Sequence, residues 1–421
     1  MSASGALARR LGLIDAIAIG LGSMIGAGVF AAFAPAAAAA GGGLLIGLAI
    51  AAVVAYANAT SSAQLAAQFP TSGGTYVYGR EMIGPWSGFF AGWSFVIGKT
   101  ASCAAMALTF ASYAVPEAWQ RPVAVAAVIV LAIVNTFGVT RTAGLTRAIV
   151  VVVLSVLVLV VVAAAASGAA TTANLTIGPG EHGWYGILQS AGLLFFAFAG
   201  YARIATMGEE VRDPQRTIPR AIVIALVLAL IVYVALAVAA LATLGPERLA
   251  ASPAPLAELA AAGCWTWTGP VVRVGAAAAS LGALLALVAG IGRTSLAMAR
   301  AGTFRGLSAV HPRYAVPHRA ELALAAVVSV LILTTDLRAA IGFSSFGVLL
   351  YYLIANVAAY RQGAAARRFP RALQIVGAVG CAVLVATLPW PSIVGGAAVV
   401  AVGVGYRALR RRARGGVTPR A

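Results

Sequence analysis

The chain has 421 residues, of which 61% are hydrophobic and 10% are charged, and its mean hydropathy is +0.95. Because an ordinary soluble domain has about 25% charged residues, these values exclude a soluble enzyme or a soluble binding module. The formal net charge of +18 would suit a nucleic-acid partner, but the basic residues gather between apolar segments in a pattern that excludes one.

Apolar segments of about 20 residues, the length needed to cross a bilayer core of ~30 Å as helices, follow one another along the chain. We count twelve of them, near residues 12–33, 42–65, 86–114, 122–139, 146–167, 184–206, 220–244, 271–297, 320–335, 339–360, 372–388 and 391–408. The connecting loops are short, so we expect a single domain over residues 1–421. The sequence therefore predicts an all-α integral membrane protein with about twelve transmembrane helices.

The basic residues indicate the topology. Of the 29, 22 fall in the two terminal segments, in loops on the same side or at span ends on that side, three fall in opposite loops (Arg121, Arg248 and Arg338) and four fall deeper within spans. By the positive-inside rule both termini are cytoplasmic, including a basic tail at 409–421. We expect a multi-pass protein of the cytoplasmic membrane that contacts anionic lipid and no nucleic acid.

The first apolar segment is interrupted by glycines at positions 20, 22, 26 and 28. Each glycine in a helix interior costs about 1 kcal/mol relative to alanine, so a helix that merely spans the membrane gains nothing from them. Their physical use is a break at mid-depth that offers main-chain N–H groups to a ligand. We therefore predict a discontinuous first helix.

The connections between spans carry three further predictions. Residues 66–85 are expected to include a short amphipathic helix, and Pro219 suits the first turn of the helix that follows residues 207–219. Residues 245–270 are expected to be loosely ordered because they are rich in proline and glycine.

The sixth segment has a glycine at mid-depth as well, in Phe195-Phe-Ala-Phe-Ala-Gly-Tyr-Ala-Arg203. A second interrupted helix there would occupy the place in a second five-helix half that the first helix occupies in the first half. Such a pair indicates an inverted-repeat transporter. We expect core repeats at about 12–167 and 184–360, followed by two extra helices at about 372–408.

These motifs resemble the amino acid permease branch of the amino acid–polyamine–organocation superfamily, which has the LeuT-type fold. The resemblance extends from residue 12 to about 320 and rests on four blocks. They are Ile19-Gly-Leu-Gly-Ser-Met-Ile-Gly-Ala-Gly-Val-Phe30; Phe69-Pro-Thr-Ser-Gly-Gly-Thr-Tyr76 with Gly92-Trp93; Phe195-Phe-Ala-Phe-Ala-Gly-Tyr201 with Glu209-Glu210-Val211 and Pro214 to Arg220; and Arg293-Thr-Ser-Leu-Ala-Met-Ala-Arg300 with His311-Pro312.

The resemblance implies a site for an amino acid between the two helix breaks. The substrate carboxylate would be held by main-chain N–H groups of the first break, a role that agrees with the partial positive charge of a helix N-terminus. The substrate amino group would meet carbonyl oxygens of both breaks, which the resemblance maps to Ile25, Phe196 and Ala199, and Phe196 matches the aromatic gate of the family. The substrate-binding residues implied in this way are Ile25, Gly26, Ala27, Gly28, Phe196, Ala199 and Gly200.

The sequence departs from the family pattern at three positions that bear on the substrate and the coupling ion. Ala27 replaces the usual hydroxyl residue, and Ala202 stands where many relatives have an acid. Because no acidic residue lies deep in a span, a strongly cationic substrate is disfavoured. Val153 takes the place of the lysine that some proton-coupled relatives have in the fifth helix, so the coupling ion stays open.

Lys99 is the only lysine in the chain and lies near the middle of the third span. A charge at that depth costs ~3 kcal/mol or more unless it is solvated. Two interpretations are equally balanced: Lys99 is the protonatable coupling group or touches substrate, or it is a fixed cation that binds carbonyls of a broken helix.

Four more charged residues are coupling or gating candidates. Arg203 follows the second break and would meet substrate or, as we favour, pair with Glu209 or Glu210. The same two acids and Arg293 are expected to form a charge network at the cytoplasmic mouth, although a solvated cap is an equal alternative.

The sequence therefore predicts a secondary active transporter that moves amino acids by alternating access, preferentially by proton symport and with a neutral or anionic substrate. An amino acid exchanger and a cationic amino acid or polyamine permease are alternatives, and a non-transporting membrane sensor or subunit is a different class. No residue pattern of an intramembrane enzyme is present. We expect no enzyme activity, cofactor or metal, and the sequence indicates no oligomeric state.

Overall fold

The computed structural model describes residues 11–26, 28–71, 73–137, 143–175, 178–179, 182–263, 265–300 and 318–415, with only the main chain at 143, 289, 292–300 and 411–415. Its α-helices are α1 (Leu13–Met24), α2 (Gly28–Ala31), α3 (Phe33–Ala40), α4 (Leu44–Gln68), α5 (Thr75–Met82), α6 (Pro85–Ala114), α7 (Glu117–Thr136), α8 (Ala143–Ala166), α9 (Gly183–Phe198), α10 (Ala202–Ala205), α11 (Pro214–Ala251), α12 (Pro255–Ala261), α13 (Thr268–Arg300), α14 (His318–Thr334), α15 (Leu337–Tyr360), α16 (Arg371–Thr387) and α17 (Trp390–Gly415). Short 3₁₀ turns lie at Gly41–Gly43, Thr172–Asn174 and Ala199–Tyr201.

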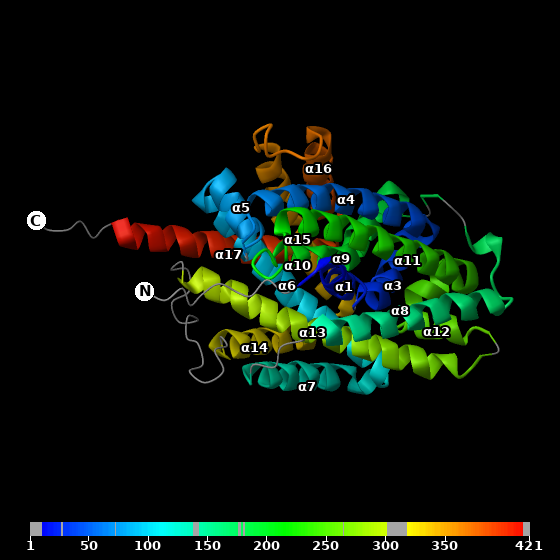
Figure 1. Ribbon diagram of the computed structural model, residues 1–421. Coiled ribbons are helices and arrows are strands. Elements are labelled where there is room, and N and C mark those ends of the chain that lie inside the picture. The colour runs from blue at the N-terminus through cyan, green and yellow to red at the C-terminus, as the bar shows by residue number, and fades with distance from the viewer. Residues whose placement is uncertain are drawn as a thin grey trace, which may run out of the picture.

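The long helices lie roughly side by side in one bundle, with α7 and α14 along one edge (Figure 1). Ten segments of the described chain are long and apolar enough to cross a membrane. The two remaining predicted spans hold α14 and α16, which have 17 residues each and so reach about 25 Å. The all-α, multi-pass architecture is confirmed, whereas the count of twelve membrane-crossing helices is not.

Both predicted breaks are present. The first helix ends at Met24 and resumes at Gly28 as α2, which α3 continues after Ala32. The sixth helix ends at Phe198, passes through a 3₁₀ turn at Ala199–Tyr201 and resumes as α10. Figure 1 shows α1, α9 and α10 near the centre of the bundle. The glycine pattern of the sequence thus predicted both discontinuous helices correctly.

The end of α17 and the label α5 lie toward the same end of the bundle in Figure 1, which we call the terminal side. Leu11 is tied there to the loop after α10: its N–H donates to the carbonyl of Glu210 (3.1 Å), and its own carbonyl accepts from Arg212 N–H (2.9 Å). Arg147 at the start of α8 forms an ion pair with Asp15 of α1 at 3.0 Å. These contacts join the terminal-side ends of α1, α8 and α10.

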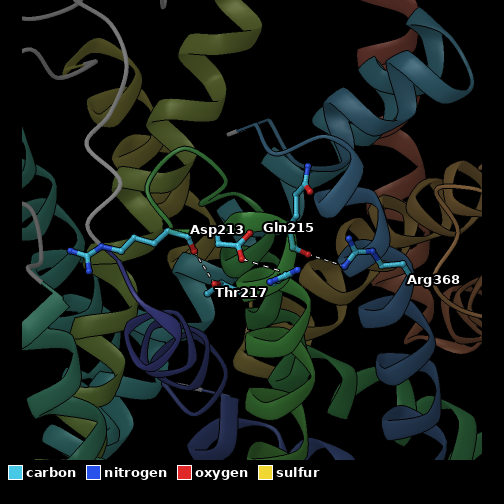
Figure 2. A network of polar contacts seen from close by, with 6 residues as sticks. Asp213, Gln215, Thr217 and Arg368 are labelled. Carbon is cyan, nitrogen blue, oxygen red and sulfur yellow. Dashed lines mark hydrogen bonds and ion pairs between the residues drawn. The ribbon is translucent and has the colours of Figure 1, made fainter.

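The start of α11 is held on the same side by polar contacts of loop residues. Figure 2 shows Arg368, from the loop before α16, pointing toward α11, where its Nη1 donates to the carbonyl of Gln215 at 2.8 Å. The hydroxyl of Thr217 donates to the Arg212 carbonyl at 2.8 Å. Asp213, which precedes α11, has a left-handed backbone (φ 45°), a conformation that aspartate tolerates better than most residues.

The opposite end, which we call the far side, is closed around Tyr113 of α6. The Tyr113 hydroxyl donates to the carbonyl of Phe30 (3.2 Å) and accepts from the N–H of Leu256 in α12 (3.3 Å). Nη1 of Arg273 in α13 donates to the Tyr113 carbonyl at 3.0 Å. The Phe30 and Tyr113 rings also meet edge to face. The Tyr113 side chain therefore joins α2, α6 and α12, and the Tyr113 main chain binds α13.

The connections between spans differ from the sequence predictions in two places. A short helix, α5, lies within 66–85 as predicted. The described part of residues 245–270, however, is not loosely ordered: helical structure resumes at Pro246 after Gly245 (φ 73°), and α12 follows. Prolines at the first turn stabilise both short stretches. Pro219 does not begin a helix, because α11 already begins at Pro214.

Candidate functional site

A cavity of about 780 Å³ extends from the two helix breaks to the terminal side. Its deep part is lined by Gly28, Phe196 and Met106, and its mouth by residues such as Tyr76 and Glu210. Its size falls in the range of small-molecule sites in proteins. Since the far side is closed around Tyr113, the cavity is accessible from the terminal side.

One face of α6 forms a continuous wall of this cavity. Gly92, Phe95, Lys99, Ser102 and Met106 all line it. Their spacings of three and four residues place them on one stripe of a helix. Lys99 lies half way along α6, and the residue is only 7% exposed. The stripe therefore runs from the mouth to the deep end, with the single lysine at the level of the breaks.

The two breaks touch each other main chain to main chain. A Cβ on Gly200 would lie 2.5 Å from the Met24 nitrogen and even closer to the Ser23 carbonyl. A Cβ on Gly28 would lie 2.6 Å from the Cα of Ala197. Only glycine allows a backbone approach as close as this, so both glycines are required by the contact between α1, α2 and α9.

Tyr233 of α11 connects the same two breaks. Its buried hydroxyl lies 2.8 Å from the carbonyl oxygen of Met24 and 2.9 Å from that of Ala197. A phenol has one proton, so the two acceptors share one donor. Tyr233 belongs to none of the sequence motifs described above, although it is the only polar side chain between Arg220 and Thr243.

The predicted substrate residues divide between two cavities. Gly28, Phe196, Ala199 and Gly200 line the large cavity. Ile25 and Gly26 instead line a separate space of about 10 Å³, together with the apolar side chains of α8 and α13, namely Ile149, Val150, Val153 and Ala279. Ala27 lies outside the described residues. The predicted carboxylate cradle at residues 26–28 stays a prediction.

Gly26 faces α13, where a Cβ would lie 2.7 Å from the Cβ of Ala283. We expect Gly26→Ala to push α1 away from α13 and to lower transport about tenfold, because an overpacked contact costs about 1–3 kcal/mol. Adding Ala283→Gly to the Gly26→Ala variant removes the opposing Cβ and should restore part of the lost transport. Transport rates of both single variants and the double variant check this. A double variant no better than Gly26→Ala would contradict the contact.

Lys99 binds the second break directly. Its Nζ donates to the carbonyl of Ala199 at 3.3 Å, the contact expected from its interpretation as a fixed cation. Among the carbonyls implied for the substrate amino group, that of Phe196 also has a protein donor, the N–H of Ala199. Two of the implied acceptors are therefore already engaged by the protein. A role of Lys99 in proton coupling stays a prediction.

The other charged candidates lie nearer the mouth. Arg203, Glu209 and Glu210 all line the cavity on its terminal side, so the structure brings these three predicted residues together. The side chain of Arg293 lies outside the described part of α13. Within the described residues, no group of three or more His, Cys, Asp or Glu side chains is placed to hold a metal ion.

A cavity between two broken helices, at mid-depth in a bundle of membrane-length helices, defines a membrane solute transporter. The family model for amino acid permeases matches residues 11–404. The chain belongs to the amino acid permease family, and the resemblance inferred from the sequence motifs is confirmed.

The names of similar proteins agree with this assignment. Over 406 residues (96% of this chain and 92% of the relative) the chain is 61% identical to an uncharacterized transporter of Mycobacterium tuberculosis. It is 25% identical to a branched-chain amino acid permease of Bacillus subtilis over 433 residues (93% and 91%). It is 26% identical to cationic amino acid transporter 6, a chloroplastic protein of Arabidopsis thaliana, over 384 residues (84% and 66%). These proteins are transporters and not enzymes.

Proposed function

We propose that the protein is a secondary active transporter that moves neutral or anionic amino acids across the cytoplasmic membrane by alternating access, as a proton symporter. The observation that carries this proposal is the cavity that joins the two helix breaks and opens to the terminal side. Binding at such a site, followed by opening of the far side and closing of the terminal side, would carry the substrate across.

The distribution of basic residues supports a cytoplasmic terminal side. In this proposal the described conformation faces the cytoplasm, and the contacts of Tyr113 form the closed external gate. Arg203, Glu209 and Glu210 are the gating candidates at the mouth, since all three line it.

The substrate carboxylate is proposed to bind main-chain N–H groups of Gly26, Ala27 and Gly28, at the start of the helix formed by α2 and α3. Helix N-termini favour anions. Phe196 is proposed to cover the bound substrate, and its place on the wall of the cavity supports that role.

The charge of the cavity supports a substrate that is not cationic. Lys99 is a buried cation at the level of the breaks, and a cationic side chain beside it would meet a like charge in a medium of low dielectric constant. The named relatives include both a branched-chain and a cationic amino acid transporter, so their names do not decide the point.

Uptake into proteoliposomes tests the proposal. Purified protein should accumulate at least one neutral or acidic labelled amino acid, and a proton gradient, acidic outside, should increase that uptake. Protein-free vesicles and a proton ionophore are the controls. If no amino acid from a panel of all twenty is taken up, the proposal fails. If uptake needs an amino acid inside the vesicle and ignores the proton gradient, the protein is an exchanger.

A further inference from the structure

We propose that Lys99 sets the charge of the substrate, and that the cavity selects acidic amino acids, whose side-chain carboxylate binds the Lys99 ammonium. This inference rests on the proposed function, because it specifies the substrate of the same cavity. Its evidence is the position and contacts of Lys99 and the charges of the surrounding wall.

Among the described residues that line the cavity, the only carboxylates are Glu209 and Glu210 at its mouth. The neighbours of Lys99 along the α6 stripe are Phe95 and Ser102, and Phe196 and Ala283 line the same cavity. In the part of the chain that the structure describes, no carboxylate forms an ion pair with Lys99. A buried cation of this kind is complemented by an anion brought by the ligand.

The Lys99 ammonium has donors to spare. An ammonium group carries three donors, and the contact with the Ala199 carbonyl uses one of them. The Cys103 thiol, one turn from Lys99 along α6, is the polar side chain close enough to interact with it electrostatically. The Ser102 hydroxyl, on the same wall of the cavity, is engaged with Ser344 at 2.7 Å. A ligand carboxylate is the partner that would satisfy the remaining donors.

Substrate binding also changes the partner of Lys99. The Ala199 carbonyl that Lys99 now occupies is one of the acceptors implied for the substrate ammonium. An acidic amino acid resolves this competition, because its ammonium takes the carbonyl while its side-chain carboxylate takes the displaced Lys99. A neutral amino acid would displace Lys99 without giving it a new partner.

The net charge of the occupied site leads to the same substrate. With Lys99 charged, a neutral zwitterion leaves the site at one positive charge, a cationic amino acid raises it to two, and an acidic amino acid brings it to zero. Uncompensated charge is unfavourable inside a membrane. Arg203, Glu209 and Glu210 lie nearer the mouth of the cavity and are not counted in this balance at the breaks.

Glutamate and glutamine provide the test, because they have nearly the same shape and differ in charge. We expect purified wild-type protein in proteoliposomes to transport labelled glutamate with a higher kcat/KM than glutamine. Lys99→Met should lower the glutamate-to-glutamine ratio of kcat/KM on the order of ten- to a hundredfold, the value of a charge-assisted hydrogen bond. Lys99→Arg should keep the ratio above one. Thr100→Ala, next to Lys99 in α6 but outside the cavity wall, is the matched control and should leave the ratio unchanged.

The outcomes separate this inference from the proposed function. If the wild-type protein transports glutamine or leucine but not glutamate, the inference is wrong and the proposed function stands. If Lys99→Met lowers glutamate and glutamine uptake equally, Lys99 is structural and the inference is also wrong. Should Lys99→Met fail to fold, the glutamate-to-glutamine ratios of kcat/KM for the wild-type protein and for Lys99→Arg still test the inference. Absence of all amino acid uptake would instead refute the proposed function.

Discussion

Replacing Gly200 with alanine is expected to lower amino acid uptake about a hundredfold, the cost of misplacing a binding group by about 1 Å. The added Cβ meets the main chain of Ser23 and Met24, and a main chain cannot rotate away as a side chain does. The two breaks must separate, which displaces the donors and acceptors on both. Overpacking should also lower the free energy of unfolding by about 1–3 kcal/mol.

Gly405→Ala in α17 is the matched control, because a Cβ at that position has no neighbour within 4 Å. It should leave transport unchanged and stabilise its helix slightly. The measurements are the initial uptake rates of both variants in proteoliposomes and their thermal unfolding in detergent. Normal uptake by Gly200→Ala would mean that the two breaks are not in contact during transport.

Replacing Tyr233 with phenylalanine is expected to raise the half-saturating substrate concentration about tenfold. The variant keeps the ring but removes the hydroxyl that lies between the carbonyls of Met24 and Ala197. Leaving a buried acceptor unsatisfied costs about 1–3 kcal/mol, and here two acceptors lose their common donor. The breaks then lose their alignment, which affects every substrate in the same proportion.

Concentration dependence of uptake for two substrates of different charge checks this prediction. Tyr56→Phe serves as the control, since the Tyr56 side chain is partly exposed on α4 and belongs to neither break. A change in selectivity without a general change in half-saturation would contradict the role assigned to Tyr233.

The breaks themselves could be predicted from the sequence because their signal is local. Glycines within one apolar segment reveal where a helix ends, whatever surrounds it. The partners of these glycines could not be predicted in this way. The contact of Gly200 with Ser23 and the bonds of Tyr233 join segments that are far apart in the chain, and no short-range pattern encodes such pairs.

The described residues of the first break line two different spaces. The resemblance assigned Ile25 and Gly26 to the same site as Gly28, yet the first two face α8 and α13 while Gly28 faces α9. The roles that the resemblance implies for Ile25, Gly26 and Gly28 in binding substrate stay a prediction.

Lys99 also makes the proposed cycle sensitive to membrane voltage. An open cavity admits water and brings the potential of the terminal side close to Lys99, so most of the voltage falls across the closed layer around Tyr113. When access changes sides, this fixed charge meets the opposite aqueous phase without leaving α6. One elementary charge moved through 100 mV corresponds to ~2.3 kcal/mol. A negative cell interior therefore favours the inward-facing conformation of the carrier without substrate. A bound anion cancels the charge of Lys99 and so removes this effect of the voltage.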